Sequence, residues 1–165
     1  MTALAATLLY MHVVWVTPAL EPVYAAHYRR APYGPELRAL EQAEQLEHAA
    51  ELAGVPIELL AAVAQDESGL DDDRVSRCGA RGRMQLLPAS RWGRAWLEAC
   101  EERPRACEAL NVLWGAYALR DALDACGGDP HLALGFYRAG RCVAGPRGAA
   151  TIELATWIAH AMEVR

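Results

Sequence analysis

The chain has 165 residues, of which 53% are hydrophobic and 22% are charged, and its formal net charge is −5. This length and apolar content predict one folded domain with a substantial core, and they exclude a chain that is disordered over most of its length. The acidic balance also disfavours a nucleic-acid-binding protein, because such domains usually carry a surplus of basic residues.

The first residues have features of a leader for export. Residues 3–16 are predominantly apolar and have the length of the hydrophobic region of a signal peptide, and Val23-Tyr24-Ala25 gives a small-x-small cleavage pattern. No lysine or arginine precedes this run, which is unusual for a signal peptide. We predict that residues 1–25 are a signal peptide or apolar leader and that the folded domain covers residues 26–165. The alternative is that the run is a buried helix of the domain.

The remaining sequence predicts helices separated by short breaks. A helix is expected over residues 36–52, between Gly34-Pro35 and Gly54, and a second runs from Pro56 to Gly69, because proline favours the first turn of a helix and glycine the position just past its end. Residues 71–87 show no helical period and indicate an irregular segment or a small β-hairpin. The other predicted helices cover residues 88–100, 111–126, 131–138 and 152–162.

Two of these helices carry clear signals. Apolar side chains recur at steps of three and four between Val112 and Cys126, which is the pattern of a helix with one buried face. Asp129-Pro130 supplies an N-cap and a proline at the first helical position for the helix that ends at Gly140. No segment alternates convincingly with a period of two. The predicted fold is therefore mainly α, a single domain of six or seven helices.

The cysteines favour an oxidising compartment. All of them follow the predicted leader, and they form neither the CxxC pairs of a zinc or redox site nor part of an HExxH motif, so no metal is expected. Cys100 and Cys107 flank a short polar segment, which suits a local disulfide. The number is odd, so two bridges leave one thiol free, and the pairing of the full set stays open. The alternative is a set of reduced cysteines in a cytosolic protein. The five are Cys78, Cys100, Cys107, Cys126 and Cys142.

The second predicted helix has a charged residue on its apolar face. Its expected buried stripe consists of Ile57, Leu60, Val63 and Ala64. Glu67 takes the next position on this stripe, where a carboxylate costs free energy unless it is paired or neutral. Such a buried carboxyl group is suited to general acid catalysis. The alternative is that Glu67 lies in solvent at the helix end or pairs with an arginine. Asp66 points about 100° away around the helix and is expected to be solvated.

Five short segments then occur in a recognisable order. They are Gly54-Val55-Pro56, Glu67-Ser68-Gly69-Leu70, residues 79–88 (GARGRMQLLP), Asn111-Val112 with Gly115, and residues 133–140 (ALGFYRAG). Together they resemble the catalytic domain of the soluble lytic transglycosylases, which are relatives of goose-type lysozyme, over about residues 50–145. Each segment alone is common, and their order and spacing make the resemblance specific. It implies a lysozyme-like fold.

The resemblance also implies an activity. The family cleaves the β-1,4 bond between N-acetylmuramic acid and N-acetylglucosamine in peptidoglycan, and it leaves a 1,6-anhydro-muramoyl end instead of adding water. Glu67 would be the single catalytic acid/base: it would protonate the glycosidic oxygen and then take the proton from the 6-hydroxyl group that attacks the anomeric carbon. An ordinary glycosidase uses two carboxyl groups. No cofactor is implied.

Four further residues match the family's substrate-binding positions. By this resemblance, Ser68 would contact or orient the site, Met84 and Gln85 would line the glycan groove, and Tyr137 would lie near Glu67 and hydrogen-bond to it or to the sugar. Each has a structural alternative: Met84 as core filler, Tyr137 as a buried aromatic residue with its hydroxyl group satisfied, and Ser68 as a polar residue at a helix end.

The sequence departs from the family pattern at three places. Arg83 stands where the family usually has leucine, and Arg138 stands where it has asparagine, so both are expected to add positive charge close to the groove. The tyrosine usual at position 118 is replaced by Ala118, with Tyr117 one residue earlier. An arginine near Glu67 would favour its ionised form and weaken it as an acid. Alternatively, it would bind carboxylates of the peptide stems.

Three functions fit these observations. The first is an exported lytic transglycosylase, periplasmic or extracellular, monomeric, and of the small specialised kind that opens the wall for a secretion or conjugation machine. The second is a hydrolytic muramidase that activates water with a second carboxylate, from Asp71, Asp72 or Asp73. The third is a catalytically silent peptidoglycan-binding domain. The partner in each case is the peptidoglycan glycan strand, and no nucleic acid is expected.

Overall fold

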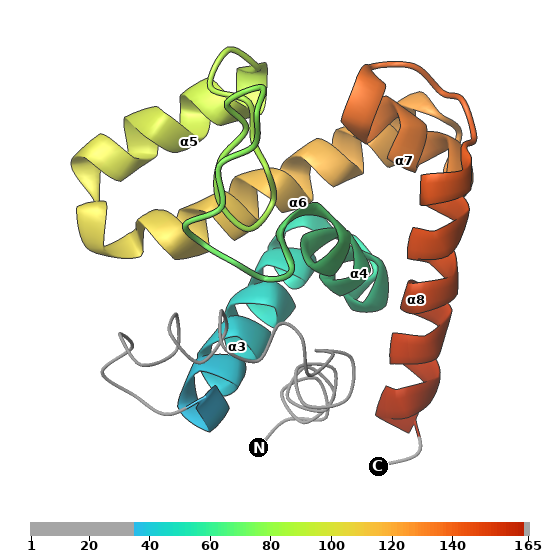
Figure 1. Ribbon diagram of the computed structural model, residues 1–165, viewed down its shortest axis with the longest axis horizontal. Coiled ribbons are helices and arrows are strands. Elements are labelled where there is room, and N and C mark those ends of the chain that lie inside the picture. Colours follow the sequence, from blue (N-terminus) through green and yellow to red (C-terminus); the bar gives the residue numbers. More distant parts are fainter. Residues whose placement is uncertain (1–34, 164–165) are drawn as a thin grey trace. The chain divides into compact units, whose positions relative to one another are not determined.

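The computed structural model describes residues 35–163, and this part of the chain is built from helices (Figure 1). The predicted leader, residues 1–25, lies outside the described residues. Within them there are six α-helices and one 3-10 helix, with no regular strand, which confirms the predicted mainly α class. The elements are α3 (Pro35–Ala53), α4 (Ile57–Ser68), α5 (Arg91–Glu102), η1 (Pro104–Ala106), α6 (Cys107–Ala125), α7 (Pro130–Ala139) and α8 (Pro146–Glu163).

The chain divides into two compact units. One unit comprises residues 45–157 and contains α4 to α7 complete, together with the later part of α3 and most of α8. The other comprises residues 1–44 and 158–165, of which the structure describes the first part of α3 and the end of α8. Every residue of the candidate site discussed below belongs to the unit of residues 45–157. None of the helices in residues 35–163 has both the length and the apolar character needed to cross a bilayer.

Helix α4 forms the centre of the larger unit. Its middle residues, Leu59 to Ala64, are all buried, so the helix is surrounded on every side rather than along a single stripe. It begins after Pro56 and ends at Gly69, which adopts a left-handed conformation with φ of 68° and closes the helix through its backbone N–H. Both ends agree with the prediction made from the proline and the glycine.

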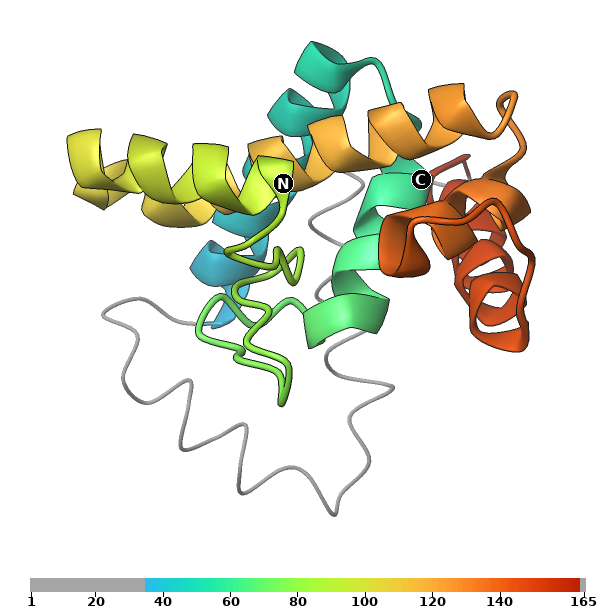
Figure 2. The same ribbon diagram turned by 90° about the horizontal axis from the view of Figure 1, so that it is seen from above.

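Helix α6 organises the rest of this unit. It lies beside α5 and packs against α7 near its other end, as both views show (Figures 1 and 2), and it also contacts α4. A disulfide between Cys100 and Cys107 joins the end of α5 to the start of α6, as predicted from the local spacing. A second bridge, Cys126–Cys142, ties the end of α6 to the segment after α7. Cys78 is the remaining thiol, and it is exposed.

The segment between α4 and α5 is held together by isolated contacts. Antiparallel bridges pair Val75 with Arg81 and Arg81 with Leu86, so residues 71–87 form tight turns instead of a hairpin of regular strands. The buried side chain of Asn111, on α6, anchors this segment: its Oδ1 accepts from the Met84 N–H at 2.8 Å, and its Nδ2 donates to the Arg81 carbonyl at 3.2 Å. The segment is therefore fixed to α6 at its centre.

Two helices begin at least four residues earlier than the sequence predicted. Helix α6 begins at Cys107 rather than 111, because η1 leads directly into it and adds a turn. Helix α8 begins at Pro146 rather than 152. Its first turn, Pro146-Arg147-Gly148, carries two residue types that usually break helices, but proline is well suited to the first helical position. This early start of α8 brings Arg147 into the site.

Candidate functional site

Glu67 lies at the C-terminal end of α4, beside the core. The stripe residues Leu60, Val63 and Ala64 are fully buried, and the side chain of Glu67 is only 10% exposed. It therefore does not extend into bulk solvent at the helix end. The sequence pattern identified this position because a carboxylate there must be compensated by specific partners.

Two arginines supply that compensation. Arg138, on α7, donates from Nε to Glu67 Oε1 at 2.8 Å, and Arg147, in the first turn of α8, donates from Nη2 to Glu67 Oε2 at 3.3 Å. Both carboxylate oxygens are thus occupied by guanidinium donors. The expectation that Arg138 adds positive charge at the site is confirmed, and so is the alternative in which Glu67 pairs with an arginine. Arg147 was not predicted.

Asp66 belongs to the same group of charges. Its Oδ2 accepts from Arg138 Nη2, from Arg147 Nε at 3.0 Å and from the Thr151 hydroxyl at 3.2 Å, while its main-chain oxygen accepts from Arg147 Nη2 at 2.9 Å. Its side chain is 26% exposed. The expectation that Asp66 is a solvated residue is therefore wrong. Asp66 belongs to the cluster because α7 and α8 place Arg138 and Arg147 on its side of α4.

We call these five residues, Asp66, Glu67, Arg138, Arg147 and Thr151, the Glu67 cluster. Its two carboxyl groups contact its two guanidinium groups. The two arginines differ in exposure: the side chain of Arg138 is 17% exposed and that of Arg147 is 55% exposed. Arg138 is therefore the inner cation of the cluster, and Arg147 is the outer one.

Tyr137 lies next to this cluster. Its hydroxyl group donates to the main-chain oxygen of Met84 at 2.7 Å. Burial raises the pKa of Tyr137 well above its ordinary value, and the negative charge of Glu67 raises it further, while Arg138 opposes these effects. Tyr137 is therefore a neutral hydroxyl group close to Glu67. The structure brings these two predicted site residues together.

Met84 faces the interior. Its side chain is fully buried against Gly115, where a Cβ atom would come within 2.4 Å of the methionine. The core-filling alternative describes this side chain. Its main chain links the two sides of the site, because its N–H is bound by Asn111 and its carbonyl by Tyr137. Met84 thus connects the 71–87 segment to α6 and α7.

Ser68 and Gln85 bond to nearby main chain. The Ser68 hydroxyl donates to the Ala64 carbonyl at 3.1 Å, one turn back in α4. Gln85 has a positive φ of 48°, and its Nε2 donates to the carbonyl oxygens of Arg74 and Gly82 at 3.0 and 2.9 Å. In this structure Gln85 stabilises the turn that carries it, and its side chain is partly exposed.

Arg83 does not add charge to a groove. Its side chain is 1% exposed, and its Nη2 lies 2.7 Å from Asp72 Oδ1 while its Nη1 donates to Gln45 Oε1 at 3.0 Å. The expectation for Arg83 is wrong, because the guanidinium group is used inside the fold. Asp72 is engaged by this pair. Asp71 accepts from the Asp73 N–H at 3.0 Å, which is the behaviour of a turn residue.

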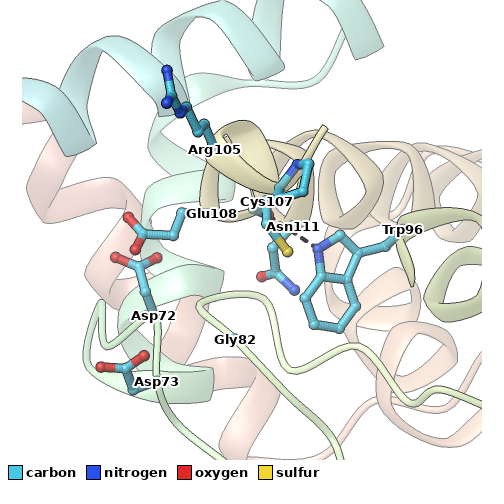
Figure 3. Close-up of a pocket in the computed structure, with 9 residues that line it drawn as sticks. Asp72, Asp73, Gly82, Trp96, Arg105, Cys107, Glu108 and Asn111 are labelled. Carbon is cyan, nitrogen blue, oxygen red and sulfur yellow. Dashed lines mark hydrogen bonds between the residues drawn. The ribbon is translucent and has the colours of Figure 1, made fainter. Parts of the chain in front are cut away.

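A pocket lies between the 71–82 segment and the start of α6 (Figure 3). Its volume is about 330 Å³, and Trp96 forms part of it, with the indole N–H donating to the Cys107 carbonyl at 3.0 Å. No member of the Glu67 cluster lines it. The lining residues are Asp72, Asp73, Gly82, Trp96, Pro104, Arg105, Cys107, Glu108 and Asn111. Within residues 35–163, no three His, Cys, Asp or Glu side chains are arranged to hold a metal ion.

Tyr117 belongs to an aromatic group on α5 and α6. Its ring stacks on Trp92 with a centroid distance of 5.8 Å, and Trp114 stacks on the same indole at 5.6 Å. Trp92 is fixed by a hydrogen bond from its indole N–H to Asp121 at 3.0 Å. Tyr117 therefore stabilises the contact between α5 and α6.

Comparison with known proteins shows to which family the chain is similar. The model of the transglycosylase SLT domain family matches residues 44–155. Among solved structures, an inactive mutant of the lytic transglycosylase Slt from Pseudomonas aeruginosa is similar, with a TM-score of 0.51 and 21% sequence identity. The match covers 96% of this chain and 28% of that chain, so this chain spans less than a third of that protein. No curated protein matches the chain. The shared fold confirms the expected lysozyme-like architecture.

Proposed function

Because the chain belongs to the transglycosylase SLT domain family, we propose that it is a lytic transglycosylase of peptidoglycan. The bond cleaved is the β-1,4 bond from N-acetylmuramic acid to N-acetylglucosamine, and the muramoyl product ends in a 1,6-anhydro ring. The observation that carries the proposal is the position of Glu67, a carboxylate held beside the core at the end of α4 and next to Tyr137.

Glu67 acts as both acid and base in this proposal. Its protonated carboxyl group donates to the glycosidic oxygen as the bond to the anomeric carbon breaks. The resulting carboxylate then accepts the proton of the 6-hydroxyl group while that oxygen attacks the anomeric carbon, so no water is consumed and Glu67 regains its proton. One carboxyl group suffices, whereas hydrolysis by two carboxyl groups requires a second one across the substrate.

The contacts of Glu67 set a condition on this chemistry. An acid must present a protonated oxygen to the substrate, and in this structure both oxygens accept from guanidinium groups. One contact must open before Glu67 can donate. Arg147 is the one that can leave, because it is on the exposed side of the cluster. Arg138 can remain, bound to Glu67 Oε1 and to Asp66.

The neighbouring residues take supporting roles. Tyr137 is a neutral hydroxyl group that positions the Met84 carbonyl and borders Glu67. Ser68 and Gln85 contact the glycan strand from the end of α4 and from the turn at residues 82–85. Met84 acts through its main chain, since its side chain is buried.

A silent peptidoglycan-binding domain is the second candidate. The two guanidinium groups on Glu67 favour it, since they hold the carboxylate as an ion-pair partner. A muramidase is less well supported, because two of its three candidate aspartates are engaged, Asp72 by Arg83 and Asp71 by its own turn. We further propose that the chain is exported and acts as a monomer, alongside a secretion or conjugation machine. The two disulfides agree with an oxidising compartment.

Replacement of Glu67 tests the proposal. Release of soluble fragments from purified sacculi is measured for the wild type, for Glu67→Gln and for Glu98→Gln, an exposed glutamate on α5 that serves as the matched control. We expect Glu67→Gln to lose at least 100-fold in rate, which is the scale of a missing acid/base group, and Glu98→Gln to match the wild type. Circular dichroism reports whether each variant is folded. Equal rates for all three would contradict the proposal.

A further inference from the structure

Arg147 holds the outer side of the Glu67 cluster. Its guanidinium group makes three contacts there, to Asp66 Oδ2, to the Asp66 main-chain oxygen and to Glu67 Oε2, at 3.0, 2.9 and 3.3 Å. The contact to Glu67 is the longest of the three. More than half of the side chain is exposed, while Arg138 behind it is largely buried. Arg147 is thus the only one of the two cations that a molecule arriving from solvent can reach readily.

We propose that Arg147 is a specificity-determining residue that exchanges its carboxylate partner when substrate binds. In the free protein it pairs with Asp66 and Glu67. A carboxylate of the glycan strand, on a peptide stem or on the lactyl group, takes the guanidinium group away from Glu67 Oε2. This inference rests on the proposed function, because it assigns a substrate group to the site that Glu67 serves.

The charges of the cluster support this exchange. With Arg147 in place, two carboxylates face two guanidinium groups. When Arg147 turns to a substrate carboxylate, Asp66 keeps Arg138 and Thr151, and Glu67 keeps Arg138 through Oε1. The remaining group then has two carboxylates and one guanidinium group. Glu67 Oε2 is the oxygen that has lost its donor.

The proposed mechanism requires a Glu67 oxygen that faces the substrate, and release of Arg147 frees Oε2 for this role. A substrate that carries a carboxylate would therefore open the contact between Arg147 and Glu67, and a neutral glycan would leave it closed. Arginine suits this role because its planar guanidinium group binds carboxylates through two parallel hydrogen bonds. Exchange between two carboxylates costs little at this position, since exposed ion pairs are only weakly stabilising.

Binding of three disaccharide probes tests the inference without turnover. Each probe is N-acetylglucosaminyl-N-acetylmuramic acid, which lacks the bond that a lytic transglycosylase cleaves. The first carries a peptide stem, the second carries the same stem with its carboxyl groups amidated, and the third has no stem and exposes the lactyl carboxylate. Affinities are measured by calorimetry for the whole chain and for Arg147→Ala, Arg147→Lys and Arg120→Ala.

Arg120 provides the matched control. It is an exposed arginine that pairs with a carboxylate, Asp124, and donates to a main-chain oxygen, that of Gly54, as Arg147 does at the Glu67 cluster. The wild type should bind at least one carboxylate probe about tenfold more tightly than the amidated probe, which corresponds to one charge-assisted hydrogen bond. Arg147→Ala should lose this preference, Arg147→Lys should keep part of it, and Arg120→Ala should keep all of it.

The outcomes distinguish the two possible sources of the carboxylate, and they distinguish failure of this inference from failure of the proposed function. A preference confined to the stem-bearing probe assigns the carboxylate to the stem, a preference confined to the stemless probe assigns it to the lactyl group, and a preference shown by both means that Arg147 accepts either carboxylate. Equal affinities in the wild type, or a preference that survives in Arg147→Ala, would overturn the inference. Unchanged cleavage by Glu67→Gln would overturn the proposed function instead, and the binding comparison does not depend on it.

Discussion

Replacing Asn111 with alanine tests how the site is supported. Asn111 is 1% exposed on α6, and its amide satisfies the buried Met84 N–H at 2.8 Å and donates to the Arg81 carbonyl at 3.2 Å. The Arg81 carbonyl also accepts from the Leu86 N–H, so it keeps a partner in the variant. The Met84 N–H does not have a second partner of this kind among the described residues, and it becomes a buried donor without an acceptor.

The expected cost follows from these two hydrogen bonds. An unsatisfied buried donor costs about 1–3 kcal/mol, and the lost bond to Arg81 adds about 1 kcal/mol. The free energy of unfolding should therefore fall by about 2–4 kcal/mol, and the Tm by roughly 10 °C for a chain of this size. Activity should fall as well, because the Met84 carbonyl is the acceptor that positions the Tyr137 hydroxyl group.

Urea denaturation and cleavage of sacculi measure the two effects. The control is Asp124→Ala, at an exposed position on the same helix, where loss of an ion pair should change stability by less than about 0.5 kcal/mol. If Asn111→Ala were as stable as this control, the account of Asn111 as the anchor of the 71–87 segment would be refuted. Unchanged activity in a clearly destabilised Asn111→Ala would refute the link to Tyr137.

Three other predictions follow from the packing and the chemistry of the larger unit. Gly115→Ala should destabilise the fold by about 1–3 kcal/mol, because the new methyl group would come within 2.4 Å of Met84, and thermal denaturation would show this as a lower Tm. Because the pKa of Tyr137 is raised in the folded protein, the neutral hydroxyl group contributes fully to stability below pH about 10, and this contribution is lost as the pH rises further. An absorbance titration should show a late-ionising tyrosine that is missing in Tyr137→Phe. Replacing Cys126 and Cys142 together with alanine removes a bridge between two cysteines that are 16 positions apart. The free energy of unfolding, measured by urea denaturation, should fall by about 3 kcal/mol. An unchanged midpoint would show that this bridge does not stabilise the fold.

Local signals predicted the helices well. The ends of α4 followed from Pro56 and Gly69, and the Asp129 side chain caps α7 by accepting from the N–H groups of His131 and Leu132, as expected from its sequence position. These features depend on the backbone preferences of single residues. The site residue Glu67 was also recognisable, because a charge on an apolar stripe violates the pattern that burial imposes.

Long-range pairing could not be predicted in the same way. Arg147 is 80 positions from Glu67. It lies in the first turn of α8, where Pro146 and Gly148 do not indicate a helix. Arg83 was expected near the groove, but its partner Asp72 comes from an irregular segment whose path the sequence does not specify. The sequence likewise does not indicate that Arg138 and Arg147 approach the side chain of Asp66. In each case the partner is chosen by tertiary packing and not by the residues beside it.

The products released from purified sacculi test the central claim most directly. Mass analysis of the muramoyl ends distinguishes a 1,6-anhydro ring from the reducing end that hydrolysis leaves, since the two differ by one molecule of water. The account predicts anhydro ends from the wild-type chain and none from Glu67→Gln. Reducing ends, or anhydro ends that persist in folded Glu67→Gln, would contradict it.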